Sequence, residues 1–117
     1  MIELQWIKSI DYKWLDFMRL DLNQVRGSGV YVIWHGGENP RVVRVGQGEL
    51  AKKLALHRES PRLMWYASQG NLFVTWAEIS SSAHRDGIET YLTQLFVPLL
   101  ADRVPSVQPL PVRSPFG

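Results

Sequence analysis

The amino-acid sequence predicts one α+β domain in which a small three-stranded antiparallel sheet is flanked by helices. Two runs of β-branched and aromatic residues, at 30–34 and 41–45, are separated by a loop containing Gly and Pro, as in a β-hairpin. A third such run covers 72–79, and apolar residues recur at helical spacing between 88 and 100. At 117 residues, the chain has room for one hydrophobic core.

Residues 1–26 are expected to form an approach segment, with a short helix around Asp11–Leu20 where apolar side chains recur at helical spacing. The main unit then covers 27–102, and its hairpin loop of about six residues covers 35–40. Strand alternation places Tyr31 on the side of its strand that also carries Ile33 and His35. On the returning strand, Val42, Arg44 and Gly46 share a face opposite Val43 and Val45. Tyr31 and Arg44 are therefore expected on the same side of the sheet.

A glycine elbow, Gly46-Gln47-Gly48, is expected to join the second strand to a helix over Glu49–Arg58. In this helix Glu49, Lys53 and His57 fall at i, i+4 and i+8 and so share one face. The glycines could let a phosphate approach the helix N-terminus, or they could simply permit a tight turn.

The remaining elements follow from capping and breaking residues. Ser60-Pro61 predicts the start of a helix that covers 62–69 and ends before Gly70. After the strand at 72–79, Ser80-Ser81-Ser82 offers caps for a last helix, which Pro98 should kink or shorten. Four prolines between 103 and 117 predict an extended tail along the surface.

Composition excludes several classes of protein. The chain has no cysteine, so disulfides, thiolate zinc sites and cysteine nucleophiles are ruled out. Its apolar runs are far shorter than the roughly 20 residues that cross a bilayer, and no signal peptide is visible near Met1. We therefore expect a soluble, cytoplasmic protein that is not inserted in a membrane.

Positive charge is concentrated between 41 and 62, although the net charge of the chain is only +2. The bases in this interval are Arg41, Arg44, Lys52, Lys53, Arg58 and Arg62, and the acids are Glu49 and Glu59. Such an excess suits a nucleic-acid backbone, and it equally suits a solvated helix face. We take Arg41, Lys52, Arg58 and Arg62 as candidate nucleic-acid-binding residues.

The order of the expected elements and four short motifs resemble the GIY-YIG nuclease superfamily. Gly29-Val30-Tyr31 matches the first signature, and Arg44-Val45-Gly46 stands in the place of the second. The segment Lys53–His57 matches the Arg-hydrophobic-x-x-His stretch of the family, and Gly87-Ile88-Glu89 matches the segment that supplies its metal-binding glutamate. The resemblance covers about 27–102, with Gly29, Gly46 and Gly48 as structural motif residues.

This resemblance implies a Mg²⁺- or Mn²⁺-dependent endonuclease that hydrolyses nucleic-acid phosphodiester bonds, with DNA as the expected partner. It implies Tyr31 as general base or water-orienting hydroxyl, Glu89 as the metal ligand, and Lys53 as the cation that neutralises phosphate charge. His57 would position a phosphate or a water, and Arg44 would supply a further cation from the neighbouring strand.

The chain departs from the family pattern at three places. Arg44 replaces the second-motif tyrosine, and Lys53 replaces an arginine whose planar fork can hold two phosphate oxygens. Ala101 and Asp102 stand where the family has an asparagine.

Three alternatives remain open at this stage. Tyr31 could be an ordinary strand tyrosine, Glu89 an acid at the edge of the helical stripe, and Lys53 and His57 solvent-facing partners of Glu49. The same fold could then serve as a catalytically inactive module that binds nucleic acid or a protein. A dimerising accessory protein would instead present an exposed aromatic patch.

Overall fold

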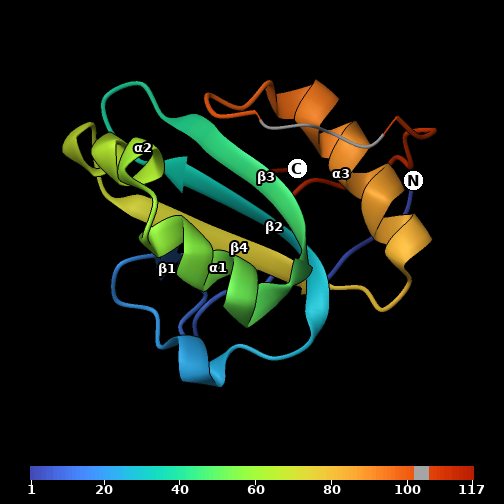
Figure 1. The fold of residues 1–117 in the computed structure, drawn as a ribbon, viewed down its shortest axis with the longest axis horizontal. Coiled ribbons are helices and arrows are strands. Elements are labelled where there is room, and N and C mark those ends of the chain that lie inside the picture. Colours follow the sequence, from blue (N-terminus) through green and yellow to red (C-terminus); the bar gives the residue numbers. More distant parts are fainter. Residues whose placement is uncertain (102–105) are drawn as a thin grey trace.

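A four-stranded antiparallel sheet in the order β1-β4-β2-β3 forms the centre of the computed structural model, which describes residues 1–101 and 106–117 (Figure 1). Its elements are β1 (Leu15–Asp16), the 3₁₀ turn η1 (Leu22–Gln24), β2 (Ser28–His35), β3 (Arg41–Glu49), α1 (Leu50–Arg58), α2 (Pro61–Met64), the 3₁₀ turn η2 (Trp65–Ser68), β4 (Leu72–Glu78) and α3 (Ser82–Phe96). The α+β class is thus confirmed. The expected number of strands was wrong, because β1 has only two residues and carries no alternation pattern.

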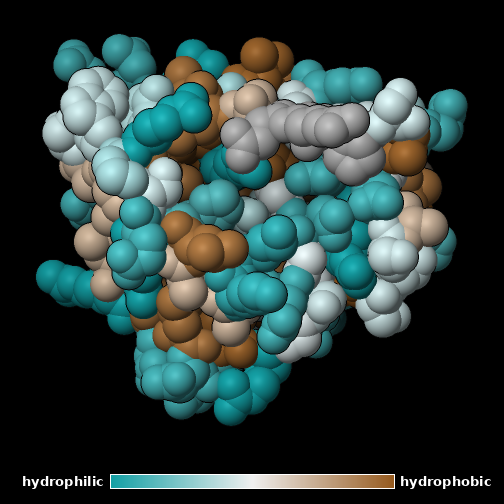
Figure 2. Space-filling model, viewed as in Figure 1, coloured by the Kyte–Doolittle hydropathy of each residue, from teal (hydrophilic) through white to brown (hydrophobic). Residues whose placement is uncertain are grey.

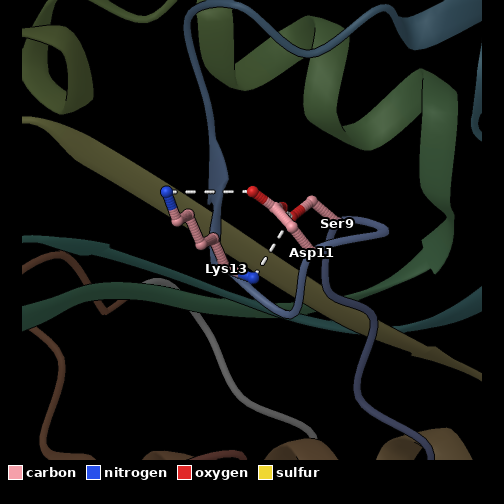
Figure 3. A network of polar contacts seen from close by, with 3 residues as sticks. All are labelled: Ser9, Asp11 and Lys13. Atoms are coloured by element: carbon pink, nitrogen blue, oxygen red, sulfur yellow. Dashed lines mark hydrogen bonds and ion pairs between the residues drawn. The ribbon is translucent and has the colours of Figure 1, made fainter.

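A tight turn replaces the helix expected around Asp11–Leu20. Tyr12 N–H donates to Ser9 O over 2.9 Å, and Tyr12 adopts a left-handed φ of 60° that a helix cannot contain. The Ser9 hydroxyl donates to Asp11 and accepts from Lys13 N–H, while Lys13 Nζ lies 3.8 Å from Asp11 Oδ2 (Figure 3). Ser and Asp side chains here compete with helical hydrogen bonding, which explains why the helix prediction was wrong.

β1 follows this turn and pairs with β4 through Leu15↔Val74 and Asp16↔Phe73. The chain before the turn also lies along β4, since Ile7 N–H donates to Trp76 O over 3.0 Å. The approach segment is therefore attached to the sheet at the edge opposite β3.

The hairpin of β2 and β3 is longer than expected, because β3 continues through the proposed glycine elbow. Gly46 pairs with Tyr31, and Gly48 pairs with Gly29, so Gly46-Gln47-Gly48 is strand and the elbow prediction was wrong. α1 begins directly after it at Leu50, whose N–H donates to Gly27 O over 3.0 Å.

A β-bulge shifts the register between Ile33 and Trp34. Ile33 pairs with Arg44 and Trp34 with Val42, which leaves Val43 as the extra residue. Val43 therefore joins the core beneath α1, whereas strict alternation placed it opposite Arg44. Arg44 and Tyr31 nevertheless lie on the same face, as predicted. Arg44 pairs with Ile33, which is two residues from Tyr31 on β2, so the three side chains share one side of the sheet.

Two hydrophobic cores lie on the two faces of the sheet. The core beneath α1 contains Leu50 and Leu54 of that helix, and the core beneath α3 contains Ile88 and Leu92. In Figure 1, α1 lies in front of the sheet and α3 lies beyond β3, at the right of the view. None of the helices in the described ranges has the length and apolar character that crossing a bilayer requires.

The helix with the apolar stripe ends at Phe96, two residues before Pro98. Val97 has a left-handed φ of 46°, and its N–H donates to Thr93 O. Leu99 and Leu100 then extend the chain along β3, where their N–H groups donate to Val42 O and Val43 O over 3.1 and 2.8 Å. The predicted shortening at Pro98 is confirmed.

The beginning of the proposed tail, 103–105, and Asp102 lie outside the described residues. Between 106 and 117 there is no helix or paired strand longer than the single bridge Ile2↔Val112. Val112 is only 1% exposed, and Phe116 packs edge-on to Trp34 with ring centroids 4.8 Å apart. This described part of the tail thus contributes side chains to the core beneath α3.

Candidate active site

A hydrogen-bonded tyrosine–histidine pair joins β2 to α1. Tyr31 Oη lies 2.6 Å from His57 Nε2, and the two rings meet at an interplanar angle of 61°. Tyr31 is 1% exposed, whereas His57 is half-buried on the last turn of α1. Water can therefore reach the pair through the imidazole. The structure brings together two residues that the sequence motifs assigned to one site.

Two glycines of β3 make room for site side chains. A Cβ atom built on Gly46 would lie 2.2 Å from Tyr31 Oη, so the phenol ring rests directly on the glycine. A Cβ on Gly48 would lie 2.9 Å from Lys53 Cε, and Gly48 has a φ of +134° that disfavours other residues. The absence of a Cβ atom at these two glycines therefore leaves the space that the side chains of Tyr31 and Lys53 occupy.

Glu89 lies half-buried on the second turn of α3, and its surroundings set an unusual charge state. Burial is the largest effect and raises the pKa of the Glu89 carboxyl to about 7. The positive charges of Arg44 and Lys53 act in the opposite direction, and the carboxylate of Asp86 raises the pKa further. These effects require Arg44, Lys53 and Asp86 to lie close to Glu89.

The five predicted site residues belong to four elements, and the described contacts link them in two groups, Tyr31 with His57 and Glu89 with Arg44 and Lys53. β2 supplies Tyr31, β3 supplies Arg44, α1 supplies Lys53 and His57 one turn apart, and α3 supplies Glu89. Figure 2, drawn in the orientation of Figure 1, shows hydrophilic surface between α1 and α3.

A polar clamp fixes the first turns of α3 against β3. Gln47 Nε2 donates to Asp86 Oδ1 over 2.9 Å, and Arg85 Nε donates to Gln47 Oε1 over 3.0 Å. Ser81 caps the helix by accepting from His84 N–H over 3.2 Å. Because Glu89 lies one turn beyond Arg85 and Asp86, this clamp sets its position. The i, i+3 spacing of Asp86 and Glu89 was a usable signal in the sequence, whereas nothing there indicated the role of Gln47.

The four candidate nucleic-acid-binding residues divide into two pairs. Lys52 and Arg62 are exposed. Arg41, at the far end of β3, donates to Val97 O over 3.1 Å. Arg58 donates to Phe17 O from Nε and Nη2 over 3.2 and 2.7 Å, and also to Leu20 O. Arg58 thereby fastens α1 to the approach segment, a role that charge counting did not reveal.

The acidic residues offer few ligands for a metal ion. Within 1–101 and 106–117, no group of three or more His, Cys, Asp or Glu side chains is placed to share an ion. Glu89, with Asp86 one turn before it, offers a carboxylate near Arg44 and Lys53. One or two carboxylates fit Mg²⁺, which keeps several of its waters, better than they fit zinc.

In comparisons with known proteins, no family model matches this chain, and neither the curated proteins nor the solved structures give a significant match. Function is therefore inferred from the motifs and from the geometry of this site.

Proposed function

We propose that this chain is a GIY-YIG-type endonuclease that hydrolyses nucleic-acid phosphodiester bonds with Mg²⁺ or Mn²⁺, and that DNA is its substrate. One observation carries the proposal. The half-buried carboxyl of Glu89 lies within electrostatic reach of Arg44 and Lys53, and Lys53 is one helical turn from the Tyr31–His57 pair. Phosphodiester hydrolysis needs these same components, namely a cation-binding carboxylate, positive charge for the phosphate and a group that handles the proton of water.

The proton-handling role falls to His57. Because Tyr31 is buried, we assign its hydroxyl a role through the 2.6 Å contact with His57 Nε2. Tyr31 is thus a positioning residue that fixes the orientation of the imidazole, and His57 orients the attacking water or takes its proton. This assignment differs from the direct role that the family resemblance implies for Tyr31.

The positive charges act on the phosphate. Lys53, whose stem lies over Gly48, and Arg44 on β3 would neutralise the charge that develops on the non-bridging oxygens. Arg44 is able to hold two oxygens, which the point charge of Lys53 cannot do. The exchange of the family's tyrosine for Arg44 therefore compensates for the exchange of its arginine for Lys53.

Glu89 would hold the divalent ion. Its burial disfavours the carboxylate, so a bound cation would restore the charge balance and lower the pKa. When bound, Mg²⁺ supplies a Lewis acid for the scissile phosphate.

A specific observation also favours a second function, that of a non-catalytic nucleic-acid-binding module. Arg44 and Lys53 already act on the charge of Glu89, which reduces its electrostatic attraction for a divalent ion. In this alternative the same cations bind phosphate, and Glu89 keeps them in place.

Nicking of supercoiled plasmid separates the two functions. The assay compares Mg²⁺, Mn²⁺ and chelator, with Glu89→Gln as test variant and Glu59→Gln, an exposed acid after α1, as matched control. The nuclease requires metal-dependent nicking that falls at least about 100-fold in Glu89→Gln and is retained in Glu59→Gln. Salt-dependent binding without nicking under either metal would reject catalysis and support the binding module.

A further inference from the structure

An exposed tryptophan projects from η2, whose residue Tyr66 packs against the core beneath α1. Trp65 is 59% exposed, which is unusual for a large aromatic side chain. The segment that carries it is held firmly. Ser60 caps α2 by accepting from Leu63 N–H over 3.3 Å, Leu63 is buried, and Ser68 Oγ donates to Trp65 O over 2.8 Å. Trp65 is therefore presented to solvent by an ordered segment.

Trp65 and Tyr66 separate two pockets. Their rings meet edge to face at 86° with centroids 5.0 Å apart, and Tyr66 stacks in parallel on the buried His35. One pocket, of about 550 Å³, is lined by Pro61, Arg62, Trp65, Tyr66, Leu99 and Leu100. The other, of about 450 Å³, is lined by His35, Glu38, Asn39, Trp65, Tyr66, Ser68, Gln69 and Leu99. Both volumes lie within the roughly 300–1,000 Å³ of typical ligand sites.

The two pockets differ in chemistry in a way that suits nucleobases. The larger one offers apolar walls beside Trp65, and Arg62 is the one charged residue that lines it in the described part of the chain. The smaller one offers the side chains of Asn39, Ser68 and Gln69, which can donate to and accept from base edges. Flat apolar faces with hydrogen-bonding edges are the shape and chemistry of an unstacked base.

The larger pocket is linked through the backbone to β3, the strand that carries Arg44. Leu100, which lines it, donates its N–H to Val43 O over 2.8 Å, and Arg44 is the next residue of β3. α2 follows α1 on the face of the sheet that Figure 1 presents, and pale surface of intermediate hydropathy covers the α2 region at the upper left of Figure 2. Along the chain, Arg62 lies between α1, which carries His57, and Trp65.

We propose that Trp65, with the pockets on either side of it, binds the bases of an unpaired nucleic-acid strand whose backbone passes through the candidate active site. This inference rests on the proposed function and deepens it, because it assigns a single-stranded or locally unpaired substrate. Arg62, Arg44 and Lys53 supply the positive charge that the backbone needs. In an intact duplex the base faces are already stacked and cannot reach Trp65. Trp65 and its two pockets, which together we call the platform, therefore select unpaired strands.

Binding is measured by fluorescence anisotropy in chelator, so that no cleavage is required, on the full chain. The probes are an end-labelled DNA strand of about 12 nucleotides, the same sequence as RNA, and the DNA duplex. Wild type binds one or both single strands more tightly than the duplex. Trp65→Ala weakens single-strand binding about 5- to 150-fold, which corresponds to the loss of one base stack. Trp65→Phe retains most of the affinity, and the two single strands distinguish DNA from RNA.

Tyr12→Ala is the matched control, because Tyr12 is an 84% exposed aromatic residue on the turn before β1. Its affinity should equal that of wild type. Unchanged single-strand affinity in Trp65→Ala, an equal loss in both variants, or tighter binding of the duplex by wild type would each overturn the inference. Failure of wild type to bind any of these nucleic acids would also overturn it and would indicate a protein partner for Trp65.

The two proposals fail separately. A chain that never nicks plasmid but binds single strands through Trp65 loses the nuclease proposal and keeps this one. A chain that nicks plasmid and binds single strands equally well after Trp65→Ala keeps the nuclease proposal and loses the platform.

Discussion

The substitution Glu89→Gln tests whether the candidate site is held at the expense of stability. Burial raises the pKa of Glu89 from its ordinary value of 4.5 to about 7 in the folded chain. Between these values the folded state keeps a proton that the unfolded state has released. The free energy of unfolding therefore falls as pH rises from 4.5 to 7, and the loss is complete above that range.

The size of this loss follows from the same difference. At about 1.4 kcal/mol for each pKa unit the upper bound is roughly 3 kcal/mol, and because the side chain is only half-buried, solvent screening reduces it to about 1–2 kcal/mol. The amide introduced by Glu89→Gln is neutral at every pH. The variant should therefore gain about 1–2 kcal/mol over wild type on going from about pH 5 to about pH 8.

Urea unfolding in chelator, followed by tryptophan fluorescence, measures this difference at both pH values. Glu59→Gln, in which an exposed carboxyl is changed in the same way, should show no comparable gain. A stability difference between Glu89→Gln and wild type that is the same at both pH values would refute the reasoning.

Two further substitutions test the packing around the site. Gly46→Ala should lower the free energy of unfolding by about 1–3 kcal/mol, because its Cβ would collide with Tyr31 Oη, and urea unfolding would contradict this if stability were unchanged. Arg58→Gln should lower it by about 1.5–3 kcal/mol through loss of charged donors to Phe17 O and Leu20 O. The control Arg62→Gln changes an exposed arginine, and its free energy of unfolding should stay within about 0.5 kcal/mol of wild type. Equal losses of stability in the two variants would argue against a special role for Arg58.

Local sequence signals predicted most of the elements. Residues close to one another in the chain determine the cap at Ser60, a cap within Ser80-Ser81-Ser82, the strand expected at 72–79 (Leu72–Glu78 in the structure) and the shortening of the last helix at Pro98. These predictions are confirmed because capping and strand patterning act within a few residues. The helix around Asp11–Leu20 was wrong because the Ser9 and Asp11 side chains form a local turn and because Leu15 pairs with β4. The glycine elbow was wrong because Gly46 remains in β3 beneath the ring of Tyr31.

The sequence proposed the residues of the candidate site and only part of their arrangement. Motif order placed Tyr31, Arg44, Lys53, His57 and Glu89 in one group. It did not show that Tyr31 would be buried behind His57, which depends on the close approach of the phenol ring to Gly46. Nor did it reveal the clamp through Gln47, which joins positions 38 and 39 residues apart along the chain.

The contacts between the two terminal segments have a consequence for how the chain folds. Ile2 pairs with Val112, and Trp6 Nε1–H donates to Arg113 O, 107 residues along the chain. Closing so long a loop has a large entropic penalty unless the intervening chain is already compact. We therefore expect the sheet and its helices to form first and the two terminal segments to dock last. Val112 completes the core beneath α3, and that helix carries Glu89, so full ordering of the candidate site awaits the final event of folding.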